Sequence, residues 1–351
     1  MEGKAADPEK RAHRDEDSQM AKILYEVKKV IVGQDHFLER VLVAMLSQGH
    51  LLVEGVPGLA KTMTIKTLAE AVHGSFKRIQ FTPDLVPADL VGTRIYNQKT
   101  AEFGTSLGPV FTNLLLADEI NRAPAKVQSA LLEVMQEHQV TIGGETFKVP
   151  EPFLVMATQN PIEAEGTYPL PEAQVDRFMM KVLVDYPSEE EEFVIVERMI
   201  GAPPAARTVA DMGRLMDLQR ECVGVYVDPS LIQYAVRLVA ATRRPDKFGV
   251  PDITKYIMYG ASPRASIYLI VTARSLAFLR GRDYVVPQDV VDMVLDVLRH
   301  RLVLSYEALS DAVTADVILR RILEHLPPPA PPLEGHVVVA GRGDAAQRAE
   351  V

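Results

Sequence analysis

The chain has 351 residues, of which 47% are hydrophobic and 24% are charged, a composition typical of a globular protein with room for two domains. Its 38 basic and 47 acidic side chains give a formal net charge of −9, which argues against broad, sequence-independent binding to nucleic acid. The single cysteine, Cys222, excludes an intrachain disulfide and suits a reducing compartment.

The two ends of the chain differ in composition from the rest. Residues 1–20 are crowded with charge and lack the apolar core of a signal peptide, so we expect a disordered N-terminal extension. Residues 327–351 open with a proline-rich run and are predicted to form a flexible tail, with docking of a partner as the alternative. Since no apolar run reaches the length of a membrane span, the sequence predicts a cytoplasmic protein that does not contact membranes.

A glycine-rich turn at residues 55–62 follows an apolar run and precedes a helical pattern. Such a turn lets backbone N–H groups surround phosphate oxygens at the positive end of a helix dipole. Lys61 is expected to reach the β and γ phosphates of ATP or GTP, and Thr62 to ligate Mg²⁺. Ala60 stands where glycine is usual, which leaves a plain strand–turn–helix connection as the alternative. The predicted nucleotide ligands in this segment are Gly55, Val56, Pro57, Gly58, Leu59, Ala60, Lys61, Thr62 and Met63.

Two acids, Asp118 and Glu119, end the apolar segment that starts at Asn113. At the carboxyl edge of a parallel sheet these side chains would meet the phosphates. Asp118 is predicted to hold Mg²⁺ and Glu119 to polarise the attacking water, because phosphoryl transfer needs separate groups for these two tasks. The alternative is a pair of solvated acids at the end of a strand.

A further apolar strand, residues 153–158, runs into Gln159 and Asn160. Asn160 is predicted to orient water beside Glu119 at the same edge of the sheet. An asparagine before a proline is also a common turn residue, which is the alternative reading. The eight histidines show no zinc-like spacing, so Mg²⁺ bound with the nucleotide is the only metal inferred.

The chain divides into a part rich in strands and a part rich in helices. Strand-like runs alternate with helical patterns up to residue 187, which predicts an α/β fold with a five-stranded parallel sheet and flanking helices. From residue 188 amphipathic helices follow one another, which predicts an all-α lid domain over residues 188–326. The predicted strands cover residues 51–53, 76–81, 114–117, 153–157 and 180–184. The predicted lid helices cover residues 188–200, 228–242, 263–280, 287–301 and 310–326.

Two segments interrupt the predicted α/β domain. Residues 83–108 contain Gly92, Gly104 and Gly108 and predict a hairpin or loop where a simple fold would need only a helix. Residues 140–148 alternate in polarity around a Gly-Gly pair, which is a strong signal for a hairpin. Both segments could contact a client, and loops without client contact are the alternative.

A series of motifs in the same order resembles the MoxR family of AAA+ ATPases, over about residues 20–325. The resemblance implies ATP as the nucleotide, a P-loop AAA+ domain over residues 21–187, and a lid after it. It also implies that residues 83–108 are the helix-2 insert and residues 140–148 the presensor 1 hairpin of that family. The motifs are residues 31–34 (IVGQ), 55–62 (GVPGLAKT), 116–124 (LADEINRAP), 157–161 (ATQNP), 170–178 (LPEAQVDRF) and 260–265 (GASPRA).

The resemblance implies roles for residues that spacing alone does not assign. The adenine pocket would include Val32, Gly33 and Gln34. Asn160 would be the sensor 1 residue. Arg264 would be the sensor 2 arginine that contacts the γ-phosphate.

Arg177 is similar to the arginine finger of this family, which acts on the nucleotide of a neighbouring subunit. An arginine supplied in this way contributes roughly 10³ to 10⁵ to turnover. The alternative is an ion pair with Asp176 or Glu172 in the same chain. Arg122 and Arg243 are further arginines that could face a neighbour.

The resemblance also implies a function and partners. It implies a ring, with a hexamer as the family expectation, that hydrolyses ATP to remodel or mature protein complexes, including the insertion of metal cofactors. The implied partners are a protein client and a protein with a von Willebrand factor A domain. The alternatives are a nucleotide-switched assembly scaffold with little turnover and a motor that acts on DNA.

Overall fold

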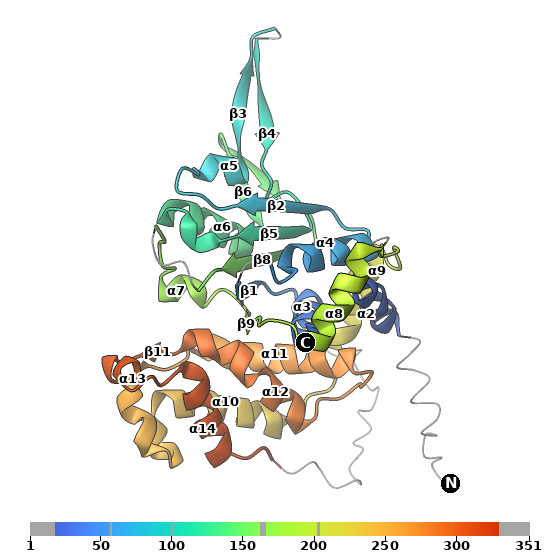
Figure 1. Cartoon of the computed structure of the whole chain (residues 1–351). Coiled ribbons are helices and arrows are strands. Elements are labelled where there is room, and N and C mark those ends of the chain that lie inside the picture. Colours follow the sequence, from blue (N-terminus) through green and yellow to red (C-terminus); the bar gives the residue numbers. More distant parts are fainter. Residues whose placement is uncertain (1–17, 57, 100, 162–165, 202–203, 330–351) are drawn as a thin grey trace, which may run out of the picture.

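The computed structural model describes residues 18–56, 58–99, 101–161, 166–201 and 204–329. The predictions for residues 1–17, for Pro57 and for the tail from residue 330 onward lie outside these ranges. Within them, a parallel sheet with helices on both faces is followed by a group of helices on one side of it (Figure 1). None of the described helices is both long enough and apolar enough to cross a membrane.

The main sheet has five parallel strands in the order β2-β5-β8-β1-β9. This arrangement confirms the predicted fold class. The three central strands are almost continuously apolar because both of their faces are buried, as is usual in parallel sheets. The strands are β1 (Leu51–Glu54), β2 (Phe76–Gln80), β5 (Leu114–Asp118), β8 (Leu154–Gln159) and β9 (Met180–Leu183).

Helices cover both faces of the sheet, and alternate residues of one strand enter different hydrophobic cores. Leu51 and Val53 of β1 lie in the core that includes α2, α3 and α4, whereas Leu52 lies in the core that includes α6. This alternation follows from the pleat of a strand, whose successive side chains point to opposite faces. The flanking helices are α2 (Gln19–Val30), α3 (Asp35–Leu46), α4 (Lys61–Ala71) and α6 (Ala125–Glu137).

The chain after the sheet is mainly helical. The helices after β9 are α8 (Glu189–Ile200), α9 (Met212–Val223), α10 (Pro229–Arg243), α11 (Pro263–Leu279), α12 (Pro287–Leu298), α13 (Tyr306–Ser310) and α14 (Ala315–His325), and the short helix α7 (Glu172–Val175) lies between β8 and β9. Short 3₁₀ turns connect several elements: η1 (Ile120–Arg122), η2 (Pro245–Phe248), η3 (Pro251–Tyr256) and η4 (Arg299–Arg301). Side chains from α9 to α12 and α14 join the core formed by α2, α3 and one face of the sheet, so the two parts share a continuous apolar interior.

Two details of the helical part differ from the prediction. The helix predicted over residues 310–326 is present as α14 but begins only at Ala315, because Ala312 adopts a positive φ of 53° and Thr314 caps the helix, its hydroxyl accepting from the Val317 N–H. Strands also occur here, since β10 (Ile257–Tyr259) pairs with β11 (Val303–Leu304) in antiparallel fashion. These strands are far apart in the sequence, so a local pattern could not reveal their pairing.

Two hairpins extend from the sheet domain. The segment predicted as an insert forms a short helix, α5 (Pro87–Val91), and a hairpin of β3 (Gly92–Asn97) and β4 (Glu102–Leu107) that projects well beyond the rest of the molecule (Figure 1). The second hairpin consists of β6 (Gln139–Ile142) and β7 (Glu145–Lys148). Its turn lies at Gly143, which has a φ of 59° and packs against the side chain of Arg94 on β3. The two hairpins therefore touch each other.

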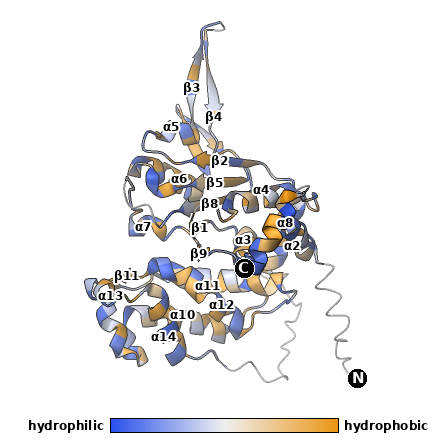
Figure 2. Cartoon of the chain, viewed as in Figure 1, coloured by the Kyte–Doolittle hydropathy of each residue, from blue (hydrophilic) through white to orange (hydrophobic). Residues whose placement is uncertain are grey.

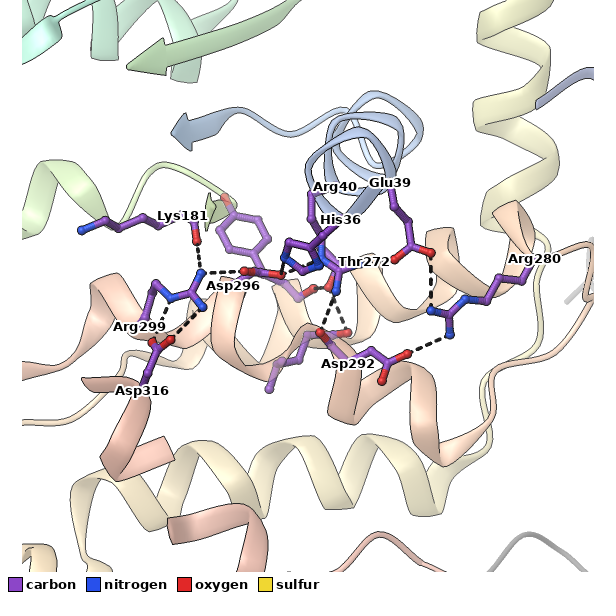
Figure 3. A network of polar contacts seen from close by, with 12 residues as sticks. His36, Glu39, Arg40, Lys181, Thr272, Arg280, Asp292, Asp296, Arg299 and Asp316 are labelled. Carbon is purple, nitrogen blue, oxygen red and sulfur yellow. Dashed lines mark hydrogen bonds and ion pairs between the residues drawn. The ribbon is translucent and has the colours of Figure 1, made fainter. Parts of the chain in front are cut away.

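A buried network of charges joins α3 to α12 (Figure 3). Arg40 Nε lies 2.6 Å and His36 Nε2 lies 3.1 Å from Oδ2 of Asp296, and Arg299 Nη1 lies 2.6 Å from its Oδ1. Burial alone would raise the pKa of Asp296, but the hydrogen bond from His36 and the charges of Arg40, His36 and Arg299 hold it at about 2. Arg299 also pairs with Asp316, which ties α14 to the same network.

Candidate nucleotide-binding site

A cavity of about 810 Å³ lies at the carboxyl edge of the main sheet. Its walls come from the start of α4, the ends of β5 and β8, the loop before α3, and α8. The polar residues predicted from three separate strand ends meet here, as expected where parallel strands end together. The predicted site residues that line it are Val32, Gln34, Gly58, Leu59, Ala60, Lys61, Thr62, Met63, Asp118, Glu119 and Asn160.

Three predicted ligands are not among the residues that line the cavity, although they lie next to the lining segments in the sequence: Gly33, Gly55 and Val56. Gly55 has a structural role, since a Cβ at this position would lie 2.5 Å from the carbonyl oxygen of Val184 after β9. Gly33 has a positive φ of 65°, and a Cβ on it would lie 2.5 Å from the carboxylate of Glu191. Both glycines thus allow close packing around the cavity.

The turn before α4 places Ala60 in the left-handed region, with a φ of 55° and a ψ of 15°. This conformation costs a residue with a side chain roughly 1 to 2 kcal/mol, which is why glycine is usual at this point. The structure accommodates Ala60, whose carbonyl oxygen accepts from the Thr64 N–H in the first turn of α4. The departure from the usual motif therefore leaves the turn and the helix start in place.

Lys61 begins α4 and directs its ammonium group back over the turn, where Nζ donates to the carbonyl oxygen of Gly55 at 2.6 Å. Burial lowers the pKa of Lys61, against the opposing effect of Asp118, Glu119 and Glu54. Among the described residues no carboxylate forms an ion pair with Lys61. Its positive charge is thus directed to the cavity without being neutralised by direct contact.

Asp118 ends β5 and is held by two neighbouring strands. Its Oδ1 accepts from the Thr158 hydroxyl at 2.5 Å, and its Oδ2 accepts from Nη2 of Arg78 at 2.6 Å. The Thr158 hydroxyl also accepts from the N–H of Glu119 at 2.9 Å. A single threonine on β8 therefore fixes the positions of both acids.

Glu119 follows in the left-handed conformation, with a φ of 57°, at the point where the chain leaves β5. Its Oε2 lies 2.7 Å from Nε2 of Gln80 and 3.1 Å from Nε of Arg122. These contacts hold the carboxylate at the cavity wall. Asn160, directly after β8, lines the same cavity and is only 8% exposed.

The protein groups available to a metal are the hydroxyl of Thr62 and the carboxylate of Asp118, both in the cavity wall. Within the described ranges no three His, Cys, Asp or Glu side chains gather as a metal cage. Mg²⁺ characteristically binds to one or two protein oxygens together with substrate phosphates. The donor set therefore fits a Mg²⁺ that is shared with a nucleotide, and does not fit a resident metal centre.

The helix α8 forms a wall of the cavity that the sequence did not reveal, because its pattern assigned it to the lid. Ile195, Arg198 and Met199 line the cavity from this helix. Arg198 Nη1 donates to the carbonyl oxygen of Lys29 at 2.7 Å, which fastens α8 to the end of α2. Other missed residues are Arg78 and Gln80, whose alternating polar positions at the end of the edge strand β2 could have marked them.

The structure places Arg264 away from the cavity. Its Nη1 lies 3.0 Å from Oδ2 of Asp176, whose Oδ1 also accepts from Nε of Arg301 at 2.7 Å. The predicted contact of Arg264 with a γ-phosphate is therefore not prepared at the cavity of its own chain, because α11 begins beside α7 rather than beside this cavity. Arg177 is half-buried next to this cluster, and in the described part of the chain it forms no ion pair with Asp176 or Glu172.

The chain matches known families and relatives along most of its length. Residues 50–180 match the model for the "ATPase family associated with various cellular activities (AAA)", and residues 251–322 match the "AAA lid domain". Over 322 residues the chain is 57% identical to "Chaperone MoxR1" of Mycobacterium tuberculosis, an alignment that covers 91% of this chain and 85% of that protein. The chain belongs to the MoxR family of AAA+ ATPases.

Other relatives support this assignment. "Protein MoxR" of Methylorubrum extorquens is 30% identical over 87% of this chain and 93% of its own length. The crystal structure of a protein from Cytophaga hutchinsonii superposes with a TM-score of 0.85 at 46% identity, covering 92% of this chain and 98% of that one. The resemblance to the MoxR family that the sequence motifs indicated is therefore confirmed. A solved structure also has the same fold as this chain.

Proposed function

We propose that this MoxR family member hydrolyses ATP with Mg²⁺ in a ring of identical subunits, and that the cycle remodels client proteins. The observation that carries the proposal is the convergence of Lys61, Asp118, Glu119 and Asn160 on one cavity of about 810 Å³. A cavity of this size falls in the range of small-molecule and cofactor sites. Its cation, its metal-binding oxygens and its acid are the groups that phosphoryl transfer requires.

The phosphates would bind at the turn before α4. Lys61, half-buried and directed over this turn, would balance their negative charge. Thr62 and Asp118 would hold Mg²⁺, which supplies positive charge to the phosphate oxygens when it is bound. Val32 and Gln34 would contact the base from the loop before α3.

The attacking water would be held by Glu119 and Asn160. Glu119 would accept the proton of the water, while Asn160 would orient it by hydrogen bonding. In the structure the carboxylate of Glu119 is bound by Gln80 and Arg122, so it must exchange at least one of these partners for the water. The rate would then depend on how readily these contacts open.

The remaining positive charge would come from a neighbouring subunit. Arg177 lies beside the Asp176 cluster and outside the cavity of its own chain, which supports a role in trans. Arg264 also lies outside that cavity, and we extend the same proposal to it. Each active site would thus be completed only by assembly, and the family expectation for this assembly is a hexamer.

The hydrolysis cycle would be used to remodel a protein client. The name of the relative "Chaperone MoxR1" supports this class of function. The projecting β3–β4 hairpin and the β6–β7 hairpin that touches it are the surfaces we assign to client contact. Maturation of a protein complex, insertion of a metal cofactor, and cooperation with a von Willebrand factor A-domain protein are proposals that rest on the family alone.

The test is ATP turnover per subunit with Mg²⁺ over a wide range of protein concentration, for the wild type and for Arg177→Ala. We expect the wild-type rate to rise with concentration and the variant rate to stay flat, so that at concentrations where the wild type is assembled the variant is slower by roughly 10³ to 10⁵, with nucleotide binding retained. Arg220→Ala is the matched control, since Arg220 lies on the exposed surface of α9. A turnover rate that depends neither on protein concentration nor on Arg177 would favour the alternative function, a nucleotide-switched assembly scaffold with little turnover.

A further inference from the structure

We propose that Arg301 is a positioning residue, which holds the backbone on both sides of Arg177 and so determines where the Arg177 side chain can reach. The inference rests on the role proposed above for Arg177 at the nucleotide of a neighbouring subunit. Arg301 belongs to η4, directly after α12, and does not line the cavity of its own chain. Any effect of Arg301 on turnover would therefore act through another residue.

The side chain of Arg177 is available to a partner. It is half-buried, and in the described part of the chain its guanidinium forms no hydrogen bond or ion pair. Arg177 lies in the turn between α7 and β9, where its N–H donates to the carbonyl oxygen of Gln174 and the N–H of Phe178 donates to that of Val175, both at 3.1 Å. These local bonds use the N–H groups of the turn, and its carbonyl groups are bound from the helical part of the chain.

Arg301 makes the contacts to these carbonyl groups. Its Nη2 donates to the carbonyl oxygen of Asp176 at 3.1 Å and to that of Phe178 at 2.6 Å, the residues directly before and after Arg177. Its Nη1 donates to the carbonyl oxygen of Met179 at 3.2 Å, and its Nε donates to Oδ1 of Asp176 at 2.7 Å. One guanidinium thus binds three backbone carbonyls and one carboxylate within residues 176–179.

The guanidinium of Arg301 is itself fixed by α11 and α12. Its remaining N–H group donates to the carbonyl oxygen of Val297 in α12, so all five donors of the side chain are used. Its Cζ lies 5.0 Å from the centroid of the Tyr268 ring on α11, and the side chain is 1% exposed. A buried polar group whose donors are all satisfied makes its surroundings rigid. The turn that carries Arg177 is therefore fixed relative to α11 and α12.

Polar contacts join the turn after α7 to the helical part of the chain. Figure 2 shows mostly hydrophilic residues on α7 and at the end of α11 that lies nearest to it. Oδ2 of Asp176 accepts from Nη1 of Arg264 at 3.0 Å and from the hydroxyl of Ser262 at 3.2 Å. Hydrogen bonds are directional, whereas the burial of apolar surface is not. This junction therefore fixes the orientation of the turn as well as its distance from α11.

The planar fork of an arginine is necessary for these contacts. A lysine could pair with the carboxylate of Asp176, but its single nitrogen could not also reach the separate carbonyl groups of Phe178 and Met179. The turn would then be free to shift. A misplacement of about 1 Å can lower turnover by about 10²-fold, which is the effect we expect when Arg177 is no longer held in place.

The first step of the test measures Arg301→Lys alone. At protein concentrations where the wild type is assembled, the kcat for ATP should fall by about 10²-fold. The KM for ATP and the sedimentation coefficient of the assembly should not change, because Arg301 does not line the cavity. Arg321→Lys on α14 is the matched control and should keep the wild-type kcat, since the side chain of Arg321 is 45% exposed. A wild-type kcat in Arg301→Lys would overturn the inference.

The second step determines which active site has lost activity. In a mixed assembly, an Arg301→Lys chain keeps its own Lys61 and Glu119, and a Glu119→Gln neighbour keeps a correctly held Arg177. The site shared by these two chains is complete, so a mixture of the two impaired proteins should regain ATP turnover. A mixture of Arg301→Lys with Arg177→Ala should regain none, because neither chain can supply a correctly held Arg177.

A third mixture separates this inference from the proposed function. If Arg177→Ala and Glu119→Gln do not restore turnover to each other, the role of Arg177 in a neighbouring site is wrong, and the proposed function loses this part. If they do restore turnover, and Arg301→Lys with Glu119→Gln does not, then Arg301 serves only the fold or the site of its own chain. That result would overturn the inference and leave the proposed function standing.

Asp176→Asn is the second variant, to be used if circular dichroism shows that Arg301→Lys does not fold. The asparagine keeps a neutral acceptor for Nε of Arg301, and the Asp176 side chain is 21% exposed, so the fold should tolerate the change. Turnover should fall, and it should be regained with Glu119→Gln but not with Arg177→Ala. Wild-type turnover in Asp176→Asn, or a loss that the Glu119→Gln chain does not restore, would contradict the role assigned to Arg301.

Discussion

Two arginine–aspartate ion pairs have the same nitrogen–oxygen distance, 2.6 Å, in very different surroundings. Arg40 and Asp296 join α3 to α12, and their side chains are 3% and 2% exposed. Arg78 and Asp118 lie at the nucleotide cavity, and theirs are 46% and 16% exposed. Distance alone therefore does not tell which pair determines stability and which serves chemistry.

Exposure to solvent determines how much each of the two ion pairs contributes to stability. An exposed pair gains little because water screens it and solvates either partner when it separates. In a buried pair, removal of one partner leaves a charge without water or counterion, which is strongly destabilising. The cavity charges can therefore exchange partners, as the proposed binding of phosphate and Mg²⁺ would require, whereas the charges around Asp296 cannot.

The largest expected effect concerns chemistry at the cavity. Glu119→Gln should lower ATP turnover by roughly 10² to 10⁴, because the amide cannot accept the proton of the attacking water. The free energy of unfolding should change by no more than about 0.5 kcal/mol, since Glu119 makes only exchangeable contacts. Turnover assays and urea denaturation measure the two quantities. Glu133→Gln, on the exposed face of α6, is the control, and unchanged turnover in Glu119→Gln would assign the base to another residue.

The next effect concerns stability at the buried network. Asp296→Ala should lower the free energy of unfolding by about 3 to 5 kcal/mol, because it removes the buried counterion of Arg40 and leaves Arg40 paired only with Glu39, whose side chain is 29% exposed. Denaturant unfolding monitored by circular dichroism measures this loss. The control is Asp217→Ala, whose side chain is 50% exposed in its pair with Arg220. A loss in Asp296→Ala no larger than in this control would mean that water reaches the network.

The pH dependence of stability sharpens the same contrast. Because the pKa of Asp296 is about 2 in the folded protein and 3.8 as the ordinary value, its ionised form stabilises the fold above about pH 4. This contribution, about 2 kcal/mol, should be lost as the pH falls from about 5 toward 2. Unfolding measured at several pH values should show a shallower acid dependence in Asp296→Ala than in wild type. Parallel curves would contradict the assigned pKa.

The smallest expected effect is at the exposed pair. Arg78→Ala should change the free energy of unfolding by less than about 1 kcal/mol, although the ion pair it removes is as short as the one at Asp296. Asp118 would remain bound to the hydroxyl of Thr158. The same denaturation assay measures the change. A loss as large as that of Asp296→Ala would show that exposure does not separate the two pairs.

The sequence predicted most of the residues that line the cavity, but it did not predict the wall that α8 forms. Lys61, Asp118, Glu119 and Asn160 could be identified because each stands at the end of a strand or the start of a helix, where local pattern and chemistry coincide. Arg198 on α8 could not be identified, since its helix carries an ordinary amphipathic pattern and follows the last strand of the sheet. Arg198 lines the cavity because the chain after β9 packs α8 back against the sheet domain, and a local pattern does not specify this packing.

Arg264 illustrates the same limit. The motif around it resembles the sensor 2 motif of the family, which led to the expectation of a contact with the γ-phosphate. In the structure its partner is Asp176, which directly follows α7, and Figure 1 shows α7 at the other side of the sheet domain from α8. A motif identifies the residue, whereas the position of the lid relative to the sheet determines which nucleotide that residue can approach.

The sequence by itself determined the five-stranded parallel sheet, the nucleotide turn and the polar strand ends, because alternation, turn chemistry and helix starts act over a few residues. Tertiary structure decided the pairing of β10 with β11, the contact between the two hairpins, the ion pairs around Asp296 and the exposure of Phe193, Val196 and Ile200 on α8. These features join residues that are distant in the sequence, or depend on which faces are left uncovered, and only the packing of the whole chain specifies them.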